Sequence, residues 1–543
     1  MKTRAYPLLI HLSIFVFCVF VGACSKADSL KLSIDNLSVT AQGGNYSFEV
    51  KSNVHWQLSG IPDFISCTPS SGEGNTTISI QVQANLKHTE RTATLIINGG
   101  SQLSSTLNIT QQQYTLNTAP TAPKLLTPTA QQEAVSVITS FSWEASTDEN
   151  DDEIFYYLYY SLDQQSWNNI PCGTETTCTL KLPMRGESLY YWKVLANDNR
   201  SGYTESTVGS FTTDVSNYHN EGDVRTLMLN RENNGVNLVF MCDGYTTKDL
   251  VIGGTYDQMA ERAVEYFFDI EPYKTYRDNF NAYLVYSYSD DSGISYGAEN
   301  KLKNTSFSLT CDKDSRTSTR IECNQNKVLT YAQMAPVGPL TETLVIVLAN
   351  DTRYAGTCWM WTNGQAIALF TTPEDNYPYN FKGTLQHEAG GHGFGKLADE
   401  YVSATTAATR NRSDIPAYHA YGTCTNVDTT KNLSTIYWKH FVGLSGYESV
   451  GAYEGAYYFP TGVWRPENGS CMINNIAYYN APSREAIVKR IKYLAREEYS
   501  FEEFLAKDVT AMPAFMPPPP TKLQEHLYLH PPIFVDDYML RKP

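Results

Sequence analysis

The chain has 543 residues, more than one hydrophobic core supports, so roughly three or four domains are expected. Acidic residues outnumber basic ones by 57 to 41 and give a formal net charge of -16. This balance argues against nucleic-acid or anionic-membrane binding, because those partners require a basic surface that neutralises phosphates. We therefore predict no nucleic-acid partner.

The first residues have the pattern of a targeting signal and not of a folded element. Lys2 and Arg4 precede a largely apolar stretch, residues 7–23, and Cys24 follows directly. The Val-Gly-Ala-Cys tetrapeptide that ends at Cys24 resembles a bacterial lipobox. The resemblance implies a lipoprotein signal peptide at 1–23, an anchor linker at 24–29 and acyl chains on Cys24.

Such a protein is secreted and lipid-anchored to the bacterial outer membrane or cell surface. The membrane is then a partner only through the lipid anchor, and more than one acyl chain is needed because a single chain binds marginally. An uncleaved anchor is the alternative, although the apolar stretch is short for a bilayer span of about 20 residues.

Residues 30–113 alternate polar and apolar side chains, as in 46–51, 77–82 and 93–97, with Gly, Ser and Asn turns between them. This pattern predicts an all-β sandwich. The features at Gly43-Gly44, Ser52-Asn53, Trp56, 69–72 and Gln111-Gln112 resemble the BACON module. The resemblance implies either a spacer or a domain that binds glycan or mucin, and both readings stay open because fold does not fix function.

Residues 114–216 form a second predicted β-sandwich after a Thr/Pro/Ala-rich linker. Aromatic stretches at 141–143, 156–160, 190–194 and 210–211 resemble the strands of a fibronectin type III domain. Residues 148–153 form an acidic turn. Calcium binding is one reading of this turn, but a solvated acidic loop is commoner, and we predict no site there.

From residue 217 onward the pattern becomes that of an α/β fold. Apolar strands are predicted at 236–241, 344–349 and 365–370, and a helix at 256–268. The strand at 365–370 is expected to pair with an extended peptide. The Pro-rich tail after Met512 is predicted to wrap or to extend, without a core of its own.

The chain has 11 cysteines, of which Cys18 leaves with the signal peptide and Cys24 is acylated. Two pairs bracket short loops, Cys172 with Cys178 and Cys311 with Cys323, and each is a candidate disulfide in an oxidising compartment. Five others are expected to be buried small apolar residues; these are Cys67, Cys242, Cys358, Cys424 and Cys471.

The strongest chemical signal is His387-Glu388 followed by His392, five positions after the first histidine. A metal-activated water needs ligands on one side of a helix and a nearby base, and the familiar spacing is four residues. On an ideal α-helix a spacing of five separates the two side chains by about 140°. Gly390 and Gly391 make a one-residue π-bulge feasible, which would bring the histidines together. The alternative is an ordinary pair of Glu388 and His392 on a helix face.

The stretch 387–401, HEAGGHGFGKLADEY, resembles the zinc signature of the IgA-peptidase family of metallopeptidases. Residues 242–246, 470–472 and 481–487 agree with it, and the resemblance covers roughly 220–505. It implies a zincin-like fold, a Zn²⁺ cofactor and a turn with Met472 beneath the metal.

The third zinc ligand is either Asp399 or Glu400. In related zincins the third ligand lies six residues after the second histidine, and here that position is Ala398. Either carboxylate that follows would complete a three-ligand site with one open position. We favour Asp399, with Glu400 holding a ligand histidine and Tyr401 a weaker candidate for stabilising the oxyanion.

These signals predict a multidomain protein: two N-terminal all-β sandwiches followed by an α/β (α+β) zincin-like metallopeptidase domain at 217–543. The predicted activity is hydrolysis of an extracellular polypeptide or glycoprotein, with His387, His392 and Asp399 as metal ligands and Glu388 as the general base. The alternative is a glycan- or mucin-binding surface adhesin with an inactive zincin domain. A glycoside hydrolase would need a carboxylate pair that the sequence does not offer.

Overall fold

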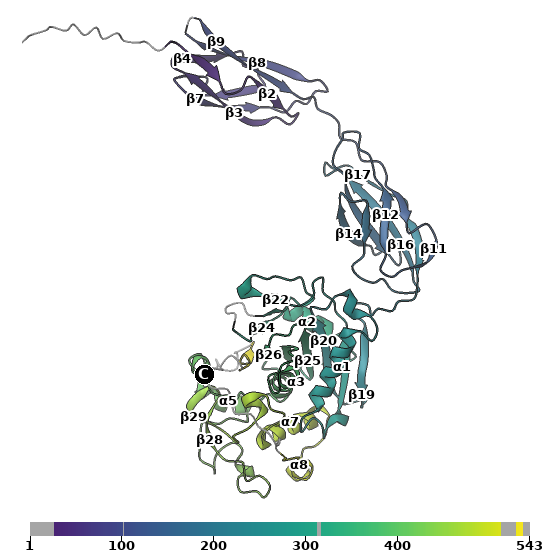
Figure 1. Cartoon of the computed structure of the whole chain (residues 1–543), viewed down its shortest axis with the longest axis vertical. Coiled ribbons are helices and arrows are strands. Elements are labelled where there is room, and N and C mark those ends of the chain that lie inside the picture. Colours follow the sequence, from purple (N-terminus) through teal and green to yellow (C-terminus); the bar gives the residue numbers. More distant parts are fainter. Residues whose placement is uncertain (1–26, 101, 312–316, 512–527, 536–543) are drawn as a thin grey trace, which may run out of the picture. The chain divides into compact units, whose positions relative to one another are not determined.

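The computed structural model describes residues 27–100, 102–311, 317–511 and 528–535 (Figure 1). The predicted signal peptide, Cys24 and the proline run 517–520 lie outside these residues. Within the described ranges, no helix combines the length and apolar character that crossing a bilayer requires. Contacts divide the chain into two units, one holding residues up to 122 with 146–155 and 196–204, and the other holding the rest.

The first β region packs two sheets around one core. Side chains alternate between buried and exposed along its long strands, and Phe48 of one sheet pairs in register with Ile78 beside it. The buried side chains of both sheets form a single cluster, which is the sandwich pattern predicted for 30–113. The first sheet contains β1 (Leu30–Leu32), β3 (Gly44–Ser52), β7 (Thr76–Val82) and β5 (Ile65–Thr68), and the second contains β2 (Asn36–Val39), β9 (Leu103–Gln111), β8 (Arg91–Gly99), β4 (His55–Ser59) and β6 (Ser71–Glu73).

The second β region also has two sheets and an aromatic core. The ring of Phe141 lies 5.0 Å from that of Trp192 and 5.8 Å from that of Phe211, both in edge-on arrangements. One sheet contains β10 (Lys124–Thr127), β12 (Ser140–Glu144) and β15 (Thr177–Thr179), and the other contains β11 (Gln132–Val135), β18 (Gly209–Thr213), β16 (Leu189–Asn197), β13 (Phe155–Ser161), β14 (Asn168–Gly173) and β17 (Tyr203–Glu205). The fibronectin type III assignment and the boundaries at 113 and 216 stay predictions.

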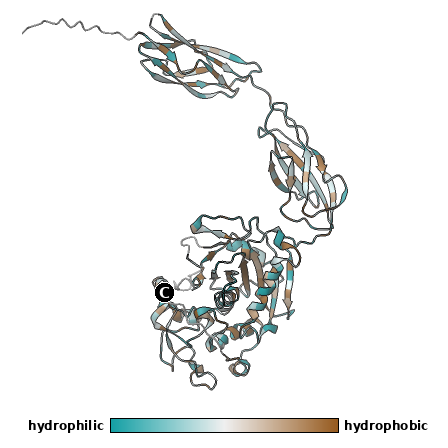
Figure 2. Ribbon diagram, viewed as in Figure 1, coloured by the Kyte–Doolittle hydropathy of each residue, from teal (hydrophilic) through white to brown (hydrophobic). Residues whose placement is uncertain are grey.

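The remaining region is built on a mixed sheet with buried faces. Its central strands are nearly continuous apolar runs, as expected where helices and loops cover both sides (Figure 2). Strands β21, β20, β25 and β27 are parallel. β19 is antiparallel to β21, and β26 is antiparallel to β27 but parallel to β30. The order across the sheet is β19 (Val224–Leu229), β21 (Phe280–Val285), β20 (Val236–Asp243), β25 (Thr343–Ala349), β27 (Ala366–Thr371), β26 (Gly356–Met360) and β30 (Ile533–Phe534).

This arrangement confirms the predicted all-β N-terminal part and the α/β part that follows it. The strands predicted at 236–241, 344–349 and 365–370 and the helix at 256–268 are all present within a few residues. The other helices and short elements are η1 (Thr247–Leu250), α1 (Thr255–Phe268), η2 (Arg277–Asn279), β22 (Ser295–Tyr296), η3 (Gly297–Glu299), β23 (Thr310–Cys311), β24 (Ile321–Glu322), α2 (Gln325–Ala332), α3 (Phe381–Leu385), the π-helix η4 (Gln386–Phe394), α4 (Ala404–Ala407), η5 (Arg412–Asp414), α5 (Ile415–Ala420), η6 (Lys439–Phe441), β28 (Tyr453–Ala456), β29 (Phe459–Arg465), α6 (Cys471–Asn474), α7 (Ala481–Leu494) and α8 (Phe501–Lys507).

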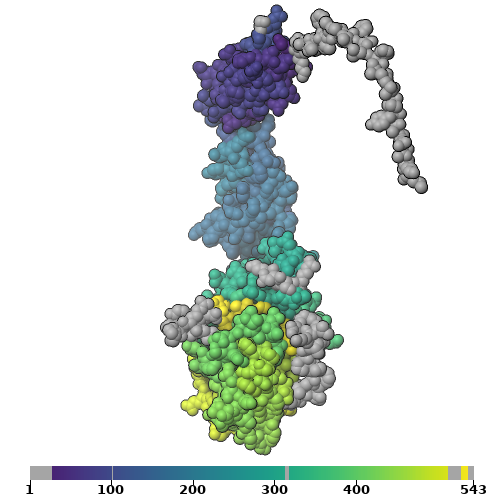
Figure 3. Space-filling view, turned by 90° about the vertical axis from the view of Figure 1, so that its left-hand side faces the viewer, coloured from purple at the N-terminus to yellow at the C-terminus, as the bar shows by residue number. Residues whose placement is uncertain are grey.

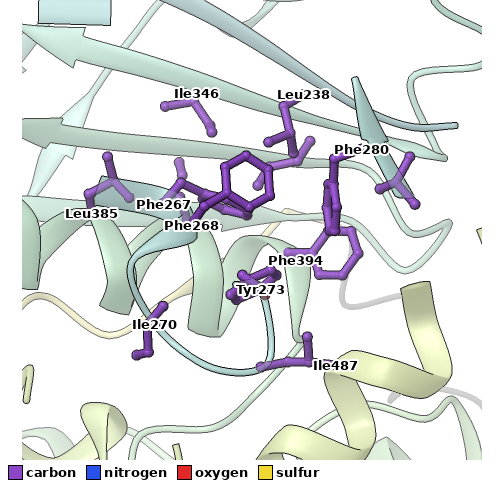
Figure 4. Close-up of a cluster of buried hydrophobic side chains, with 14 of the residues drawn as sticks. Leu238, Phe267, Phe268, Ile270, Tyr273, Phe280, Ile346, Leu385, Phe394 and Ile487 are labelled. Carbon is purple, nitrogen blue, oxygen red and sulfur yellow. The ribbon is translucent and has the colours of Figure 1, made fainter. Parts of the chain in front are cut away.

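An aromatic cluster fixes the π-helix against one face of the sheet. Phe267 of α1, Tyr273 and Phe280 of β21 surround Phe394, whose ring lies 5.6 Å from that of Tyr273 and 5.5 Å from that of Phe280 (Figure 4). Ile487 of α7 belongs to the same buried core. Close packing of this kind sets the position of the π-helix relative to the strands.

The strand expected to bind an extended peptide, 365–370, is an interior strand. β27 pairs with β25 on one side and with β26 on the other, so no backbone edge of it is free. The outer side of β26 is occupied as well: the N–H of Gly356 donates to Thr319 O at 3.0 Å, and the N–H of Val535 donates to Met360 O at 2.9 Å. That part of the prediction was wrong, because the antiparallel β26 follows β25 in sequence and adds beyond β27.

Neither candidate disulfide is formed, because Cys172, Cys178 and Cys323 are free thiols in this structure. Of the five expected to be buried, Cys67 is only half-buried, and the other four are buried.

The C-terminal segment 528–535 packs against the region that follows the π-helix. The rings of Tyr528 and Tyr401 stack at 4.1 Å, and those of Phe534 and Tyr418 at 5.1 Å. Figure 3 shows this yellow segment beside the green surface formed by residues near 400–460. The described part of the tail therefore wraps against the α/β region, which is one of the two forms predicted for it.

A buried ion pair ties α7 to the end of α8. Arg484 donates to both carboxylate oxygens of Asp508, each at 2.7 Å, and both side chains are 1% exposed. Two parallel hydrogen bonds of this kind are strong and directional. Arg484 also donates to Tyr479 O, so the same guanidinium holds the loop that precedes α7.

Replacing Asp508 by Ala is expected to destabilise the α/β region by about 3–5 kcal/mol, because Arg484 would stay buried without its counter-charge. The exposed pair Lys507–Glu503 offers a matched control, and Lys507→Ala should cost no more than about 0.5 kcal/mol. Urea unfolding followed by tryptophan fluorescence measures both. Equal losses for the two variants would contradict the role given to the buried pair.

Candidate metal centre

The segment that carries both histidines is wound as a π-helix over Gln386–Phe394. Sequence reasoning predicted a one-residue bulge, whereas the wider turn extends through the whole stretch. A turn of this width places residues five apart on one face, so His387 and His392 lie side by side. Their ring centroids are 4.8 Å apart.

Gly390 and Gly391 have no room for a side chain, because other residues pack directly against them. A Cβ on Gly391 would lie 2.2 Å from the sulfur of Met472, and one on Gly390 would lie 2.5 Å from the hydroxyl of Tyr479. The π-helix can therefore sit directly on the turn at α6, with Met472 fully buried below it. This is the position that the family resemblance implied for Met472.

Three side-chain atoms converge at one point. Nε2 of His387 lies 3.1 Å from Nε2 of His392 and 3.0 Å from Oδ1 of Asp399, and the third distance, His392 to Asp399, is 3.3 Å. All three side chains are at most 2% exposed. The sequence-predicted ligands are thus brought together, although 12 positions separate His387 from Asp399.

The hydrogen bond made by Nδ1 of each histidine indicates which of the two ring nitrogens carries the hydrogen. Nδ1 of His387 lies 3.0 Å from Cys471 O, and Nδ1 of His392 lies 2.8 Å from Leu397 O. A carbonyl oxygen only accepts, so each Nδ1 carries the hydrogen and each Nε2 of the neutral ring presents a lone pair. When both rings are neutral, two nitrogen lone pairs and a carboxylate oxygen face one another, which is unfavourable unless a cation lies among them.

The donor set fits Zn²⁺. Two imidazole nitrogens and one carboxylate oxygen are the ligands of many catalytic zinc sites, which bind at about 2.0–2.2 Å. Ligand atoms on a tetrahedral ion at that range lie about 3.4 Å from one another, close to the three separations observed here. His387, His392 and Asp399 could accordingly hold the ion and leave a fourth position open.

Asp399, and not Glu400, points to the histidines. Oε1 of Glu400 accepts from Nδ2 of Asn426 and from Nδ2 of Asn480, both at 2.7 Å. Burial raises the pKa of Glu400 to about 7, against the effect of these two amides. The expected bond from Glu400 to a ligand histidine is absent, because backbone carbonyls already occupy both Nδ1 atoms. Glu400 instead joins the loop at Asn426 to the start of α7.

Tyr458 is a functional residue that sequence reasoning missed. Its hydroxyl donates to Oδ2 of Asp399 at 2.6 Å and so leaves Oδ1 to face the histidines. Tyr458 and the preceding Tyr457 have φ values of +73° and +49°, a left-handed conformation that costs energy for residues other than glycine. The turn between β28 and β29 places the Tyr458 hydroxyl at Asp399, although the two residues are 59 positions apart. No spacing in the sequence indicates this contact.

Glu388 lies beside the three convergent groups and is fully buried. Within the described residues neither of its oxygens makes a hydrogen bond of normal geometry. A Cβ on Gly356 of β26 would lie 2.9 Å from Cγ of Glu388, so this glycine leaves the space for the carboxylate. The side chain is thus placed by packing and keeps its oxygens free for another group.

Two carboxyl groups of the site have pKa values shifted in opposite directions. Burial, with the charge of Asp399, raises the pKa of Glu388 well above its usual range, although the nearby N–H of Cys358 opposes this. Burial would also raise the pKa of Asp399, but His392 and His387 outweigh it and hold that pKa well below the usual range. A cation held by the two histidines and Asp399 would favour the charged form of Glu388, which is the form that accepts a proton.

Tyr401, the weaker oxyanion candidate, has its hydroxyl satisfied elsewhere. It donates to Leu529 O at 2.9 Å, and the residue is 3% exposed. Packing with a satisfied hydroxyl is therefore its role in this structure.

A cavity of about 330 Å³ opens next to Gly395 and Lys396, and its lining includes neither the three convergent residues nor Glu388. Lys396 is 5% exposed and has a φ of +55°. Burial, with the charge of Arg490, lowers the pKa of Lys396 to about 7. The cavity borders the loop that links His392 to Asp399, but the candidate metal ligands do not line it.

Comparison with known families gives two matches. Residues 229–445 match the family described as "IgA Peptidase M64", and residues 56–112 match BACON, described as "Putative binding domain, N-terminal". The resemblances to the IgA-peptidase family and to BACON are confirmed by these matches, and the family that residues 229–445 match is one of metallopeptidases. No curated protein matches the chain.

Solved structures match parts of the chain with low scores. A Bacteroides ovatus GH5 xyloglucanase in complex with a heptasaccharide is 21% identical over 22% of this chain and 30% of its own, with a TM-score of 0.16. A Bacteroides thetaiotaomicron protein is 14% identical over 18% of this chain and 100% of its own, with a TM-score of 0.13. The chicken CNTN1 FN1-FN3 domains are 15% identical over 34% and 70%, with a TM-score of 0.16. None of these scores supports an inference.

Replacing Tyr458 by Phe removes one hydrogen bond from Asp399 and keeps the ring. Zinc affinity is expected to fall about 10- to 100-fold, as for other partners that orient a ligand. Tyr457→Phe is the control, since the side chain of Tyr457 pairs with Tyr418 and not with Asp399. Competition with a chromogenic chelator measures both affinities. Equal affinity in wild-type and Tyr458→Phe proteins would exclude the orienting role.

Proposed function

We propose, from the peptidase M64 family match of residues 229–445, that the chain is a zinc-dependent endopeptidase acting on extracellular proteins or glycoproteins. The observation that carries this proposal is the convergence of His387 Nε2, His392 Nε2 and Asp399 Oδ1, with both Nδ1 atoms bound to carbonyls. The three lone-pair donors would form the metal site. The neighbouring carboxylate of Glu388, which has no hydrogen-bond partner among the described residues, would be the base.

When bound, zinc would supply Lewis acidity, polarising a scissile carbonyl and acidifying a water molecule. Glu388 is the residue that moves the proton: an oxygen of its carboxylate accepts it from the attacking water and returns it to the leaving amine. The free oxygens of Glu388 suit this task, because no other side chain competes for them. His387 and His392 keep their Nδ1 hydrogens throughout, since the carbonyls of Cys471 and Leu397 hold them.

The adhesin alternative is less well supported. A domain kept only as a scaffold has no need for three convergent ligands, an unpaired glutamate and a tyrosine that orients Asp399. The BACON match at 56–112 adds a binding role, and glycan or mucin is the partner we propose for it. The peptidase region and the binding region would then act on the same glycoprotein surface.

The proposed location is the outer membrane or cell surface, with a lipid on Cys24 as the anchor. The support is the apolar stretch at 7–23 followed by the lipobox-like tetrapeptide.

Replacing Glu388 by Gln keeps the shape of the side chain and removes the base. Zinc content and melting temperature should stay near the wild-type values, while turnover falls by about 10²- to 10⁴-fold. The loss should appear in kcat and not in KM, because proton transfer takes place in the transition state. Cleavage of a quenched fluorescent peptide library by the zinc-loaded chain measures it.

Glu498→Gln, a change at an exposed glutamate, is the matched control for the lost charge. His387→Ala serves as the comparison that loses metal and activity together. Near-normal turnover of zinc-loaded Glu388→Gln protein would contradict the mechanism, and no cleavage by zinc-loaded wild-type protein would contradict the function.

Replacing Cys24 by Ala should abolish acylation and leave the chain unprocessed or unanchored. Cys18→Ala removes a cysteine from the same stretch and should leave both unchanged. Radiolabelled palmitate incorporation and membrane fractionation provide the two measurements. Normal membrane retention together with normal cleavage in Cys24→Ala would refute the anchor.

A further inference from the structure

Three aspartates from two loops meet in the unit that contains the first β region. Asp148 and Asp152 lie in the loop before β13, and Asp198 lies directly after β16. One carboxylate oxygen from each lies within 4.8 Å of the other two. The sequence predicted only a solvated acidic turn at 148–153, and it gave no signal that Asp198 would join it.

Two of the three carboxylates are poorly compensated by nearby protein groups. Oδ2 of Asp148 and Oδ2 of Asp152 are buried and have no hydrogen-bond partner among the described residues. The side chain of Asp152 is only 6% exposed, and its other oxygen lies 3.1 Å from Nε of Arg200, a largely exposed side chain. Oxygens that have lost water and gained no donor are unfavourable, so a group that binds them would be strongly stabilised.

Asp198 is held in place from three sides. Its Oδ1 accepts from the backbone N–H groups of Arg200 and Gly202, at 2.6 and 2.9 Å, and its Oδ2 accepts from Nδ2 of Asn117 at 2.7 Å. These bonds favour the charged form and hold the pKa of Asp198 below its usual value, although burial opposes this. Asp198 thus stays an anion in a fixed position close to two others.

The spacing of the first loop is that of a calcium-binding loop. Asp148, Asn150 and Asp152 occupy alternate positions, as do the first three ligand positions of a calcium loop. Oδ1 of Asp148 accepts from the N–H of Asn150 at 2.7 Å, so the loop is already curled. A site with oxygen donors alone suits Ca²⁺ better than Zn²⁺, whose protein sites nearly always include nitrogen or sulfur, or Mg²⁺, which requires a regular octahedron.

We propose that Asp148, Asp152 and Asp198 form a Ca²⁺ site that fixes the linker at 116–118. The linker already touches both loops. Asn117 donates to Asp198, the N–H of Thr118 donates to Oδ1 of Asn150 at 2.8 Å, and Asn150 donates to Leu116 O at 3.1 Å. A cation that binds the two loops together therefore also orders the residues that leave the first β region.

Calcium titration of the full, zinc-loaded chain by isothermal calorimetry tests the site. One equivalent of Ca²⁺ should bind with a Kd of about 10⁻⁴ to 10⁻³ M, the range of extracellular modules. Asp152→Asn and Asp198→Asn should each weaken binding at least about tenfold. Asp151→Asn and Glu153→Gln remove the same charge from exposed positions of the same loop and should change affinity less than about twofold.

A second measurement guards against variants that fail to fold. Limited proteolysis of the wild-type chain should cut within 116–118 in the presence of a calcium chelator, and added Ca²⁺ should protect that linker. Mg²⁺ at the same concentration should not protect it. The proposal is overturned by absence of calcium binding, by equal binding of Mg²⁺, or by control variants that lose as much affinity as Asp152→Asn.

Discussion

The α/β region depends on one electrostatic constraint, the burial of two imidazoles and a carboxylate whose ligand atoms converge on one point. Such a cluster is unfavourable in a dry interior unless the surrounding chain fixes every other hydrogen bond of the same groups. Here the carbonyls of Cys471 and Leu397 and the hydroxyl of Tyr458 do so. These three partners come from the turn at α6, the loop after the π-helix and the hairpin β28–β29, which explains why segments distant in sequence must pack together.

The backbone around the cluster follows from that requirement. A π-helix brings residues five apart to one side, and two of its carbonyls accept hydrogen bonds from tyrosine hydroxyls. Tyr273 donates to Gly390 O at 2.6 Å, and Tyr479 donates to Gln386 O at 2.5 Å. Both tyrosines are fully buried, so the same rings that fill the core also stabilise the unusual helix.

Local patterns in the sequence predicted much of this arrangement. Apolar runs gave the central strands, and His387, Glu388 and His392 were evident because their residue types and spacing belong to metal chemistry. The choice of Asp399 rested on spacing, and the structure places that side chain at the histidines. Glu400 was given the wrong partner, since nothing in the sequence reveals that two asparagines, 26 and 80 positions away, bind it. Tyr458 and Asp198 were not identified from the sequence for the same reason, because only tertiary packing brings them to their partners.

The covered outer strand of the sheet has a consequence for self-association. An exposed edge presents unpaired N–H and C=O groups that template pairing with another chain, and proteins usually block it. In this structure Thr319 and the segment 528–535 occupy the outer side of β26, and the paired residues are Trp359 with Ile533 and Met360 with Phe534. The residues of this segment thereby cover the outer edge of β26 in the large α/β sheet. They protect it from strand-to-strand aggregation, which its continuous apolar strands would otherwise favour.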